Sequence, residues 1–301
     1  MKKLLLILTA LIGFVSVPAY SQLKNMILIE EATNASCPSC AVQNPYFEQF
    51  LQNHSADVIC VTYHAWWPDE SEIMYLNDSA MNIARIIYYG FDTIGVPDCA
   101  VGGSSAPTSE FAYQGAPADT DGLILAVDSE MNVPSPVRMN VKRFVHSDSE
   151  EVRITLSATA DLVNTTLRVV VVEGQHEYDD AGDNGETIFP NIARKMLPSS
   201  DGENFDLPAG AQKTFIYTYR YNPDWTTDQL RIVAFVQTDS NESVIAAVQT
   251  TDPPTDGSNG VSSESLSGFS MRVVGTPMSP TEKVDYSLKG TDPMKVTFFC
   301  R

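Results

Sequence analysis

The chain has 301 residues, of which 43% are hydrophobic, so it is long enough to bury one large core or two cores of ordinary size. Its 38 Asp and Glu residues outnumber 19 Lys and Arg residues and give a formal net charge of −19. A strongly negative protein repels nucleic-acid phosphates and anionic membrane surfaces. We therefore expect no nucleic-acid partner.

Residues 1–21 have the pattern of an export signal. Two lysines precede an apolar run from Leu4 to Val15, and small residues lead to a predicted cleavage point before Gln22. The apolar run is too short for a membrane-spanning helix. We expect an extracytoplasmic protein, located in the periplasm, at the outer-membrane surface or in the medium.

That location affects how the five cysteines are interpreted, because disulfides persist outside the cytoplasm. An odd number leaves at least one thiol free, exchanging or joined to another chain. The cysteines are Cys37, Cys40, Cys60, Cys99 and Cys300.

Residues 22–133 alternate short apolar runs with helical segments, a pattern typical of an α/β domain. The runs at 26–29 and 57–64 predict buried strands. Helices are predicted after the cysteine pair, over 77–89 and over 119–132. The first helix is expected to bury one apolar face made of Val42, Tyr46, Phe47, Phe50 and Leu51.

From residue 134 the sequence changes to short alternating segments separated by Asp, Asn, Gly and Ser. This pattern predicts an all-β sandwich of roughly seven strands over 134–250. Residues 251–270 have the composition of a flexible linker. Residues 271–301 are expected to form a partial β domain, too short to close a sandwich alone.

The motif Cys37-Pro38-Ser39-Cys40 stands between a predicted strand and a predicted helix. Unpaired N–H groups and the helix dipole stabilise a thiolate at a helix start, and the thiolate is the attacking species in disulfide exchange. No second C-x-x-C or H-x-x-x-H motif completes a zinc site. We expect a redox-active dithiol with no bound metal or cofactor; a static disulfide remains the alternative.

The surrounding sequence resembles thioredoxins. Pro45 lies five residues after Cys40, where thioredoxins have a helix-kinking proline, and Glu31 lies six residues before Cys37, where they have a buried carboxylate. Gly95-Val96-Pro97 is similar to the thioredoxin loop that carries a cis-proline. The resemblance implies a thioredoxin-like fold for the first domain.

The same resemblance implies roles for these residues. Cys37 would attack a substrate disulfide, Cys40 would resolve the mixed disulfide, and Glu31 would carry the proton to or from Cys40. Pro97 and the backbone of Val96 would bind the substrate chain through strand-like hydrogen bonds.

Other residues near the pair have two interpretations each. Trp66 and Trp67 end the second predicted strand and would either bind substrate peptides or cover the end of the sheet. His64 could act as a third ligand beside the cysteine pair, which would make the chain a copper-binding protein. Cys99 could exchange with Cys37 or be buried in the sheet. The acidic segment 179–186 is predicted to be a solvated hairpin loop, with calcium binding as the alternative.

A narrower resemblance rests on motifs in both halves, including Ile29-Glu30-Glu31-Ala32-Thr33, Tyr88-Tyr89-Gly90, Val170-Val171-Val172-Glu173 and Arg194-Lys195-Met196-Leu197-Pro198. They are similar to a family of outer-membrane-associated proteins named for a twenty-eight-kilodalton member. Residues 273–298 resemble the start of a type nine secretion sorting domain. These resemblances imply surface or outer-membrane location and establish no activity.

The sequence thus predicts a thioredoxin-like α/β domain followed by an all-β sandwich. Its expected function is an exported thiol-disulfide oxidoreductase acting on exported proteins or peptides. One alternative is a surface-displayed binding or adhesion protein with a structural disulfide and no catalysis, and a second is a copper-binding thioredoxin-like protein. Outer-membrane proteins are further candidate partners.

Overall fold

The computed structural model describes residues 22–24, 26–105, 120–179, 181–250 and 255–256. The chain divides into two compact units, Met1–Thr255 and Asp256–Arg301, and the architecture below is that of the first. The predicted export signal, the tail over 271–301 with Cys300, and the predicted linker apart from residues 255–256 lie outside the described residues. These assignments and the domain boundaries stay predictions.

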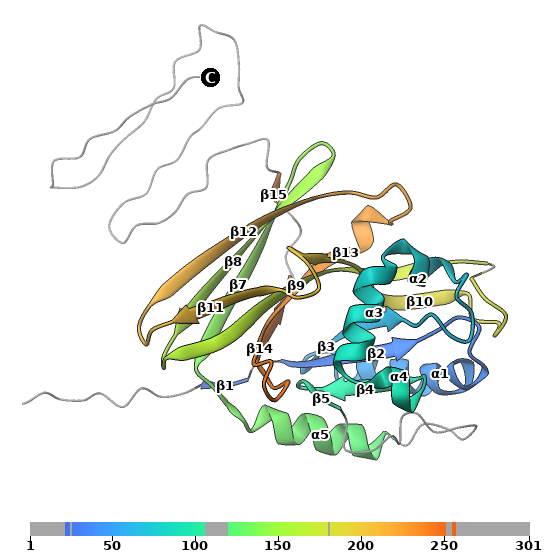
Figure 1. Cartoon of the computed structure of the whole chain (residues 1–301), viewed down its shortest axis with the longest axis horizontal. Helices are drawn as coiled ribbons and strands as arrows, with labels where there is room; N and C mark the ends of the chain where they lie inside the picture. Colours follow the sequence, from blue (N-terminus) through green and yellow to red (C-terminus); the bar gives the residue numbers. More distant parts are fainter. Residues whose placement is uncertain (1–21, 25, 106–119, 180, 251–254, 257–301) are drawn as a thin grey trace, which may run out of the picture. The chain divides into compact units, whose positions relative to one another are not determined.

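The first part of the sheet has the strand order of a thioredoxin fold (Figure 1). Strands β2 (Ile27–Thr33), β3 (Val58–His64), β4 (Asp98–Val101) and β5 (Ser104–Ser105) follow the order β3-β2-β4-β5. Strand β2 runs parallel to β3 and antiparallel to β4. Every residue of β2, β3 and β4 is buried, because helices or other strands cover both faces.

Helices cover both faces of these strands. On one face, α1 (Pro38–Asn53) and α5 (Asp121–Met131) pack through Phe47, Phe50, Leu123 and Val127. On the other lie α3 (Ser79–Tyr88) and α4 (Phe91–Ile94), with α2 (Ile73–Asn77) before them.

The predicted apolar face of the first helix is wrong in two positions. Val42 and Tyr46 are 44% and 42% exposed, whereas Gln43 and Asn44 are buried. The helix buries polar side chains here because Asn44 faces polar partners, the Thr33 hydroxyl and the Glu186 carboxylate.

The second part is a β-sandwich, as predicted. One layer contains β7 (Val137–Val145), β8 (Ser149–Ala158) and β12 (Gln212–Arg220), in the order β12-β8-β7. The facing layer contains β9 (Leu162–Glu177), β11 (Glu203–Leu207), β13 (Leu230–Gln237) and β14 (Val244–Gln249). Alternating residues such as Val152, Ile154 and Leu156 of β8 meet Val169 and Val171 of β9 in one core.

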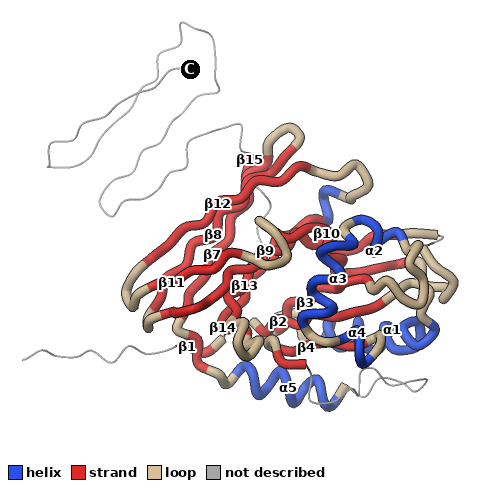
Figure 2. Tube along the Cα trace, in the orientation of Figure 1, coloured by secondary structure: helices blue, strands red, loops and turns tan. Residues whose placement is uncertain are grey.

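One strand joins the two parts into a continuous sheet. Strand β10 (Ile188–Leu197) pairs antiparallel with β9 and parallel with β3, giving the order β14-β13-β9-β10-β3-β2-β4-β5. Figure 2 shows α1 to α4 gathered around the thioredoxin-like end of this sheet, whereas the sandwich layers consist of strands and loops with one short helical turn between β12 and β13. Short elements complete the described chain: β1 (Gln22–Leu23), β6 (Pro134–Ser135), a 3-10 turn (Thr227–Gln229) and β15 (Thr255–Asp256).

A buried polar network spans the junction. Arg85 of α3 donates to both carboxylate oxygens of Glu30 at 2.8 and 2.9 Å, and both side chains are fully buried. The Tyr63 and Tyr89 hydroxyls also donate to Glu30, at 2.8 and 2.5 Å. Gln237 of β13 donates to the Tyr89 hydroxyl at 2.9 Å, which links the sandwich to this network.

We predict that Arg85→Met lowers the free energy of unfolding by about 3–5 kcal/mol, because it leaves the buried Glu30 carboxylate without its cation. Urea denaturation measures the loss. The double variant Glu30→Gln/Arg85→Met should lose less than the sum of the single variants. The control is Arg220→Met, which removes an exposed pair with Asp148. An equal loss for Arg85→Met and Arg220→Met would contradict the prediction.

Candidate redox site

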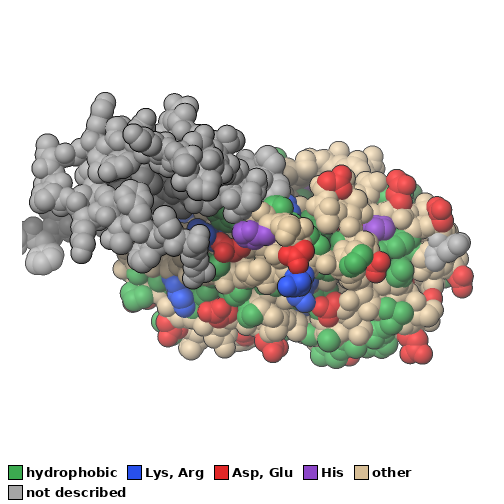
Figure 3. Space-filling view, turned by 90° about the horizontal axis from the view of Figure 1, so that it is seen from above, with side chains coloured by type: hydrophobic (Ala, Val, Ile, Leu, Met, Phe, Trp, Pro, Cys, Tyr) green, Lys and Arg blue, Asp and Glu red, His purple; other side chains and the backbone are tan. Residues whose placement is uncertain are grey.

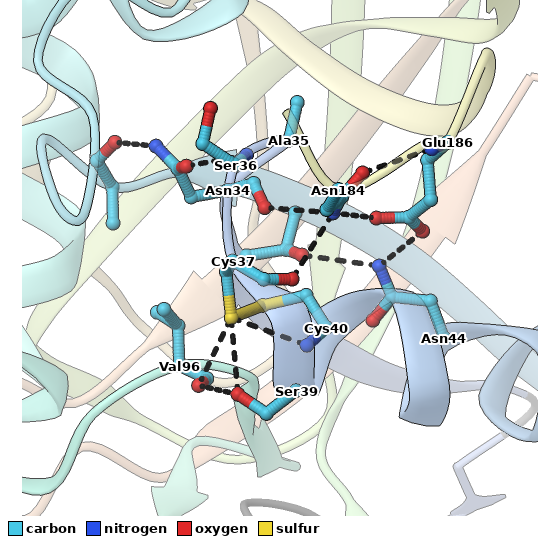
Figure 4. Close-up of a disulfide and its surroundings, with 12 residues drawn as sticks. Asn34, Ala35, Ser36, Cys37, Ser39, Cys40, Asn44, Val96, Asn184 and Glu186 are labelled. Carbon is cyan, nitrogen blue, oxygen red and sulfur yellow. Dashed lines mark hydrogen bonds between the residues drawn. A yellow bond between two sulfur atoms is a disulfide. The ribbon is translucent and has the colours of Figure 1, made fainter. Parts of the chain in front are cut away.

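The two cysteines of the motif form a disulfide at the start of α1 (Figure 4). Cys37 is the N-cap residue, and its Sγ accepts a hydrogen bond from the backbone N–H of Cys40 at 3.1 Å. Pro38 lies in the first turn of the helix. Backbone N–H groups there have no carbonyl partner within the helix, so the N–H that proline lacks costs no hydrogen bond. After reduction, the same N–H group and the helix dipole would stabilise a thiolate on Cys37.

The Val96–Pro97 turn, which precedes β4, lies next to the disulfide. The Val96–Pro97 peptide bond is cis, which matches the thioredoxin-like loop expected from the sequence. Cys37 Sγ lies 3.5 Å from the Val96 carbonyl oxygen, which also accepts a hydrogen bond from the Ser39 hydroxyl at 3.1 Å. The binding of substrate by Val96 and Pro97 stays a prediction.

Glu31 lies on β2, facing α1. It is fully buried, and burial raises its pKa to about 8, although the Thr62 hydroxyl donates to its carboxylate at 2.8 Å and counteracts part of this shift. A carboxyl with a pKa near neutrality can accept and return a proton under physiological conditions. Its proton transfer with Cys40 stays a prediction.

Two further carboxyls share a small cavity with Glu31. Burial raises the pKa of Glu48 on α1 to about 7, and burial also raises the pKa of Glu186. His64 and Asn44 line the same cavity, which has roughly the space of one water molecule. His64 is buried, with Nδ1 2.5 Å from Glu72 and Nε2 without a hydrogen-bond partner among the described residues.

The loop between β9 and β10 packs against the residues that precede Cys37. The Asn184 backbone N–H donates to the Ala35 carbonyl at 3.1 Å, and its side-chain amide donates to the Cys37 carbonyl at 3.1 Å. Glu186 accepts from Asn44 at 2.9 Å and from Asn184 at 2.5 Å. Figure 4 shows Asn184 on one side of Cys37 and Val96 with Ser39 on the other.

The disulfide is consequently covered. Cys37 is 3% exposed and Cys40 is fully buried. Attack on a substrate by Cys37 therefore requires some of the surrounding chain to move.

The remaining described cysteines are free thiols. Cys60 on β3 and Cys99 on β4 are buried on opposite sides of β2, and burial raises the pKa of both well above its ordinary value. Both thiols are therefore poor nucleophiles in the folded protein. Cys99 lies across from Glu31 in the β2–β4 pairing, while Cys37 is bonded to Cys40.

The two tryptophans that are candidates for substrate binding lie just after β3. Trp66 and Trp67 are partly buried, contact each other edge to face at 4.6 Å, and pack against the core beneath α3. Their binding of substrate stays a prediction. No group of three or more His, Cys, Asp and Glu side chains in the described chain is placed to hold a metal ion.

The sequence does not indicate that Asn184 and Glu186 lie beside the cysteine pair. The acidic segment 179–186 is recognisable in the sequence as a polar loop, but its position depends on the pairing of β10 with β3, and no local sequence pattern indicates that pairing.

The surface shown in Figure 3 carries scattered acidic side chains and few Lys or Arg, in keeping with the net charge. No helix in the described ranges is both long and apolar enough to span a bilayer.

No protein-family model matches the sequence, and no curated protein matches it. Among solved structures, HBP35 of Porphyromonas gingivalis is similar, with a TM-score of 0.62 and 14% identity over 89% of this chain and 86% of that one. This likeness supports the thioredoxin-like-plus-sandwich fold.

Two other solved structures are more distant. A protein of Agrobacterium tumefaciens has a TM-score of 0.49 and 14% identity over 80% of this chain and 98% of its own. A domain of the outer membrane lipoprotein Omp28 from Porphyromonas gingivalis has a TM-score of 0.29 and 18% identity, over 42% of this chain and 95% of that one.

We predict that Glu31→Gln flattens the pH dependence of stability in the oxidised protein. Folded Glu31 holds its proton up to about pH 8, whereas the unfolded residue ionises near its ordinary pKa of 4.5. Stability is therefore lost as pH rises from 4.5 to 8, and glutamine removes that loss, on the order of a few kcal/mol. Glu48 and Glu186 act in the same direction and leave a residual slope.

Urea unfolding at pH 5 and pH 8.5 measures this difference. Glu177→Gln, which changes an exposed carboxyl on the same sheet, serves as the control and should keep the wild-type dependence. Parallel pH curves for the wild type and Glu31→Gln would contradict the buried, protonated state of Glu31.

Proposed function

We propose that the chain is an exported thiol-disulfide oxidoreductase that acts through Cys37 and Cys40 on disulfides of proteins or peptides outside the cytoplasm. The observation that carries the proposal is the Cys37–Cys40 disulfide at the start of α1, facing the cis Val96–Pro97 turn. Exchange between sulfur atoms needs no cofactor.

In the reducing direction, the Cys37 thiolate attacks one sulfur of a substrate disulfide. A mixed disulfide forms, and the other substrate sulfur leaves and takes a proton. Cys40 then loses its proton to the ionised form of Glu31 and attacks Cys37 Sγ. The second substrate sulfur leaves and takes a proton, and the Cys37–Cys40 disulfide closes. Two electrons pass from the cysteine pair to the substrate, and the reverse sequence oxidises a substrate dithiol.

The proposed location rests on the export-signal pattern of residues 1–21. Disulfides of exported proteins persist there and are available as substrates. Partners in the outer membrane are part of the same proposal, motivated by the sequence resemblance to outer-membrane-associated proteins.

A second candidate is a surface-displayed binding or adhesion protein in which the disulfide is structural. It is favoured by the burial of both cysteines under the β9–β10 loop. The reduction potential of the Cys37–Cys40 pair separates the two candidates, because structural disulfides have potentials below about −300 mV.

We predict that the wild-type protein accelerates the reduction of insulin by dithiothreitol, followed as turbidity, and that Cys37→Ser returns the rate to that without protein. The serine hydroxyl cannot form the mixed disulfide. The matched control is Cys60→Ala, which removes a buried free thiol and should retain activity. Equal rates with wild type, Cys37→Ser and no protein, together with no closure of the Cys37–Cys40 bond when the pre-reduced protein meets oxidised glutathione, would reject the oxidoreductase proposal.

A further inference from the structure

The β9–β10 loop, residues Ala181–Thr187, covers one side of the cysteine pair. Besides the two Asn184 hydrogen bonds, the backbone N–H of Asp183 donates to the Ser36 hydroxyl at 3.1 Å. Ala181 joins Ala35 and Met74 in a small buried apolar cluster. The loop therefore contacts every residue from Ala35 to Cys37 through hydrogen bonds or apolar packing.

The contact is tight at Gly182. A Cβ atom built on this residue would lie 2.4 Å from the carbonyl carbon and oxygen of Ala35 and 2.7 Å from the Ser36 hydroxyl. These distances are far below van der Waals contact, and two of the three atoms belong to backbone. Any side chain at position 182 must push the loop away from the site.

The other side of the pair is more open. Pro38 and Ile94 are exposed, and Ser39 and Val96 are partly exposed. Ser39 and Val96 are also the residues that contact Cys37 Sγ, at 3.1 and 3.5 Å. The open approach to the sulfur therefore runs across Ser39 and the Val96–Pro97 turn.

We propose that the loop Ala181–Thr187, fixed by Asn184 and Gly182, determines substrate specificity by blocking one side of Cys37. A disulfide in a short or extended segment can reach Cys37 from the side of Val96, whereas a disulfide set in a folded surface collides with the loop. This inference rests on the proposed oxidoreductase function and adds the class of substrate: disulfides of small or unfolded peptides.

The test compares two substrates in single-turnover oxidation of the pre-reduced protein. Oxidised glutathione is the small substrate and insulin the folded one, and acid quenching followed by alkylation measures closure of the Cys37–Cys40 bond. Asn184→Ala and Gly182→Ala should raise the rate with insulin several-fold and leave the rate with oxidised glutathione nearly unchanged. Two variants are used so that misfolding of one does not end the test.

The control is Asp183→Ala, whose exposed side chain makes no hydrogen bond or ion pair among the described residues. It should leave both rates unchanged. Equal changes with both substrates, or no change in either loop variant, would overturn the inference.

Alkylation separates failure of this inference from failure of the proposed function. In a Cys40→Ser/Cys300→Ser background, Cys37 is the reactive thiol, because it lies at a helix start where the Cys40 N–H stabilises a thiolate, whereas burial in the sheet raises the pKa of Cys60 and Cys99 well above its ordinary value. The loop variants should increase alkylation by a maleimide carrying a polyethylene glycol chain several-fold more than alkylation by iodoacetamide. An unchanged ratio in both variants overturns the inference whether or not the wild type reacts with disulfides.

Discussion

Strand β10 hydrogen-bonds to β9 on one side and to β3 on the other, and this second pairing determines where the β9–β10 loop lies. Arg231 of β13 reinforces the junction, since its guanidinium donates to the Cys60 carbonyl at 3.1 Å and to Asn191 at 2.6 Å. Because β10 lies beside β3, the loop that precedes it reaches the edge where β2 leads into the cysteine pair. The sandwich thereby contributes Asn184 and Glu186 to a site that is otherwise thioredoxin-like.

Adjacent carboxyls on β2 show how the two faces of this sheet differ. Successive strand residues point to opposite faces. Glu30 faces α3, where Arg85 and two tyrosine hydroxyls bind it. Glu31 faces α1 and accepts a hydrogen bond from Thr62, with no Lys, Arg or His ion pair among the described residues. Pairing with Arg85 gives Glu30 a structural role, whereas burial without a cation makes Glu31 a group that can exchange protons near neutral pH.

The sequence predicted the elements that are defined locally. The strands β2 and β3 and the helix at the cysteine pair followed from apolar runs and helical periodicity, and the cis turn at Pro97 followed from the resemblance to thioredoxins. Strand β10 has no clear signal in the sequence, because Pro190, Asn191 and Arg194 interrupt the alternation of polar and apolar residues and its burial comes from its neighbours β9 and β3. The cover over Cys37 was missed for the same reason, since it depends on a pairing between segments about 130 residues apart.

The buried Cys37–Cys40 disulfide can still take part in thiol-disulfide exchange when the free energy needed to open the loop Ala181–Thr187 is small. The backbone of Asp183 and the backbone and side chain of Asn184 tie the loop to residues 35–37 by three hydrogen bonds. At about 0.5–1.5 kcal/mol net each, they hold the loop closed by roughly 1.5–4.5 kcal/mol. Since about 1.4 kcal/mol corresponds to a factor of ten, these three hydrogen bonds alone would reduce the open fraction to roughly a tenth to a thousandth, and the Glu186–Asn44 hydrogen bond and the packing of Ala181 reduce it further. Attack on a disulfide that needs the loop to open would be slowed by at least that factor and not abolished, whereas a small disulfide that approaches across Val96 needs no opening of this loop. Burial alone therefore does not make this disulfide structural.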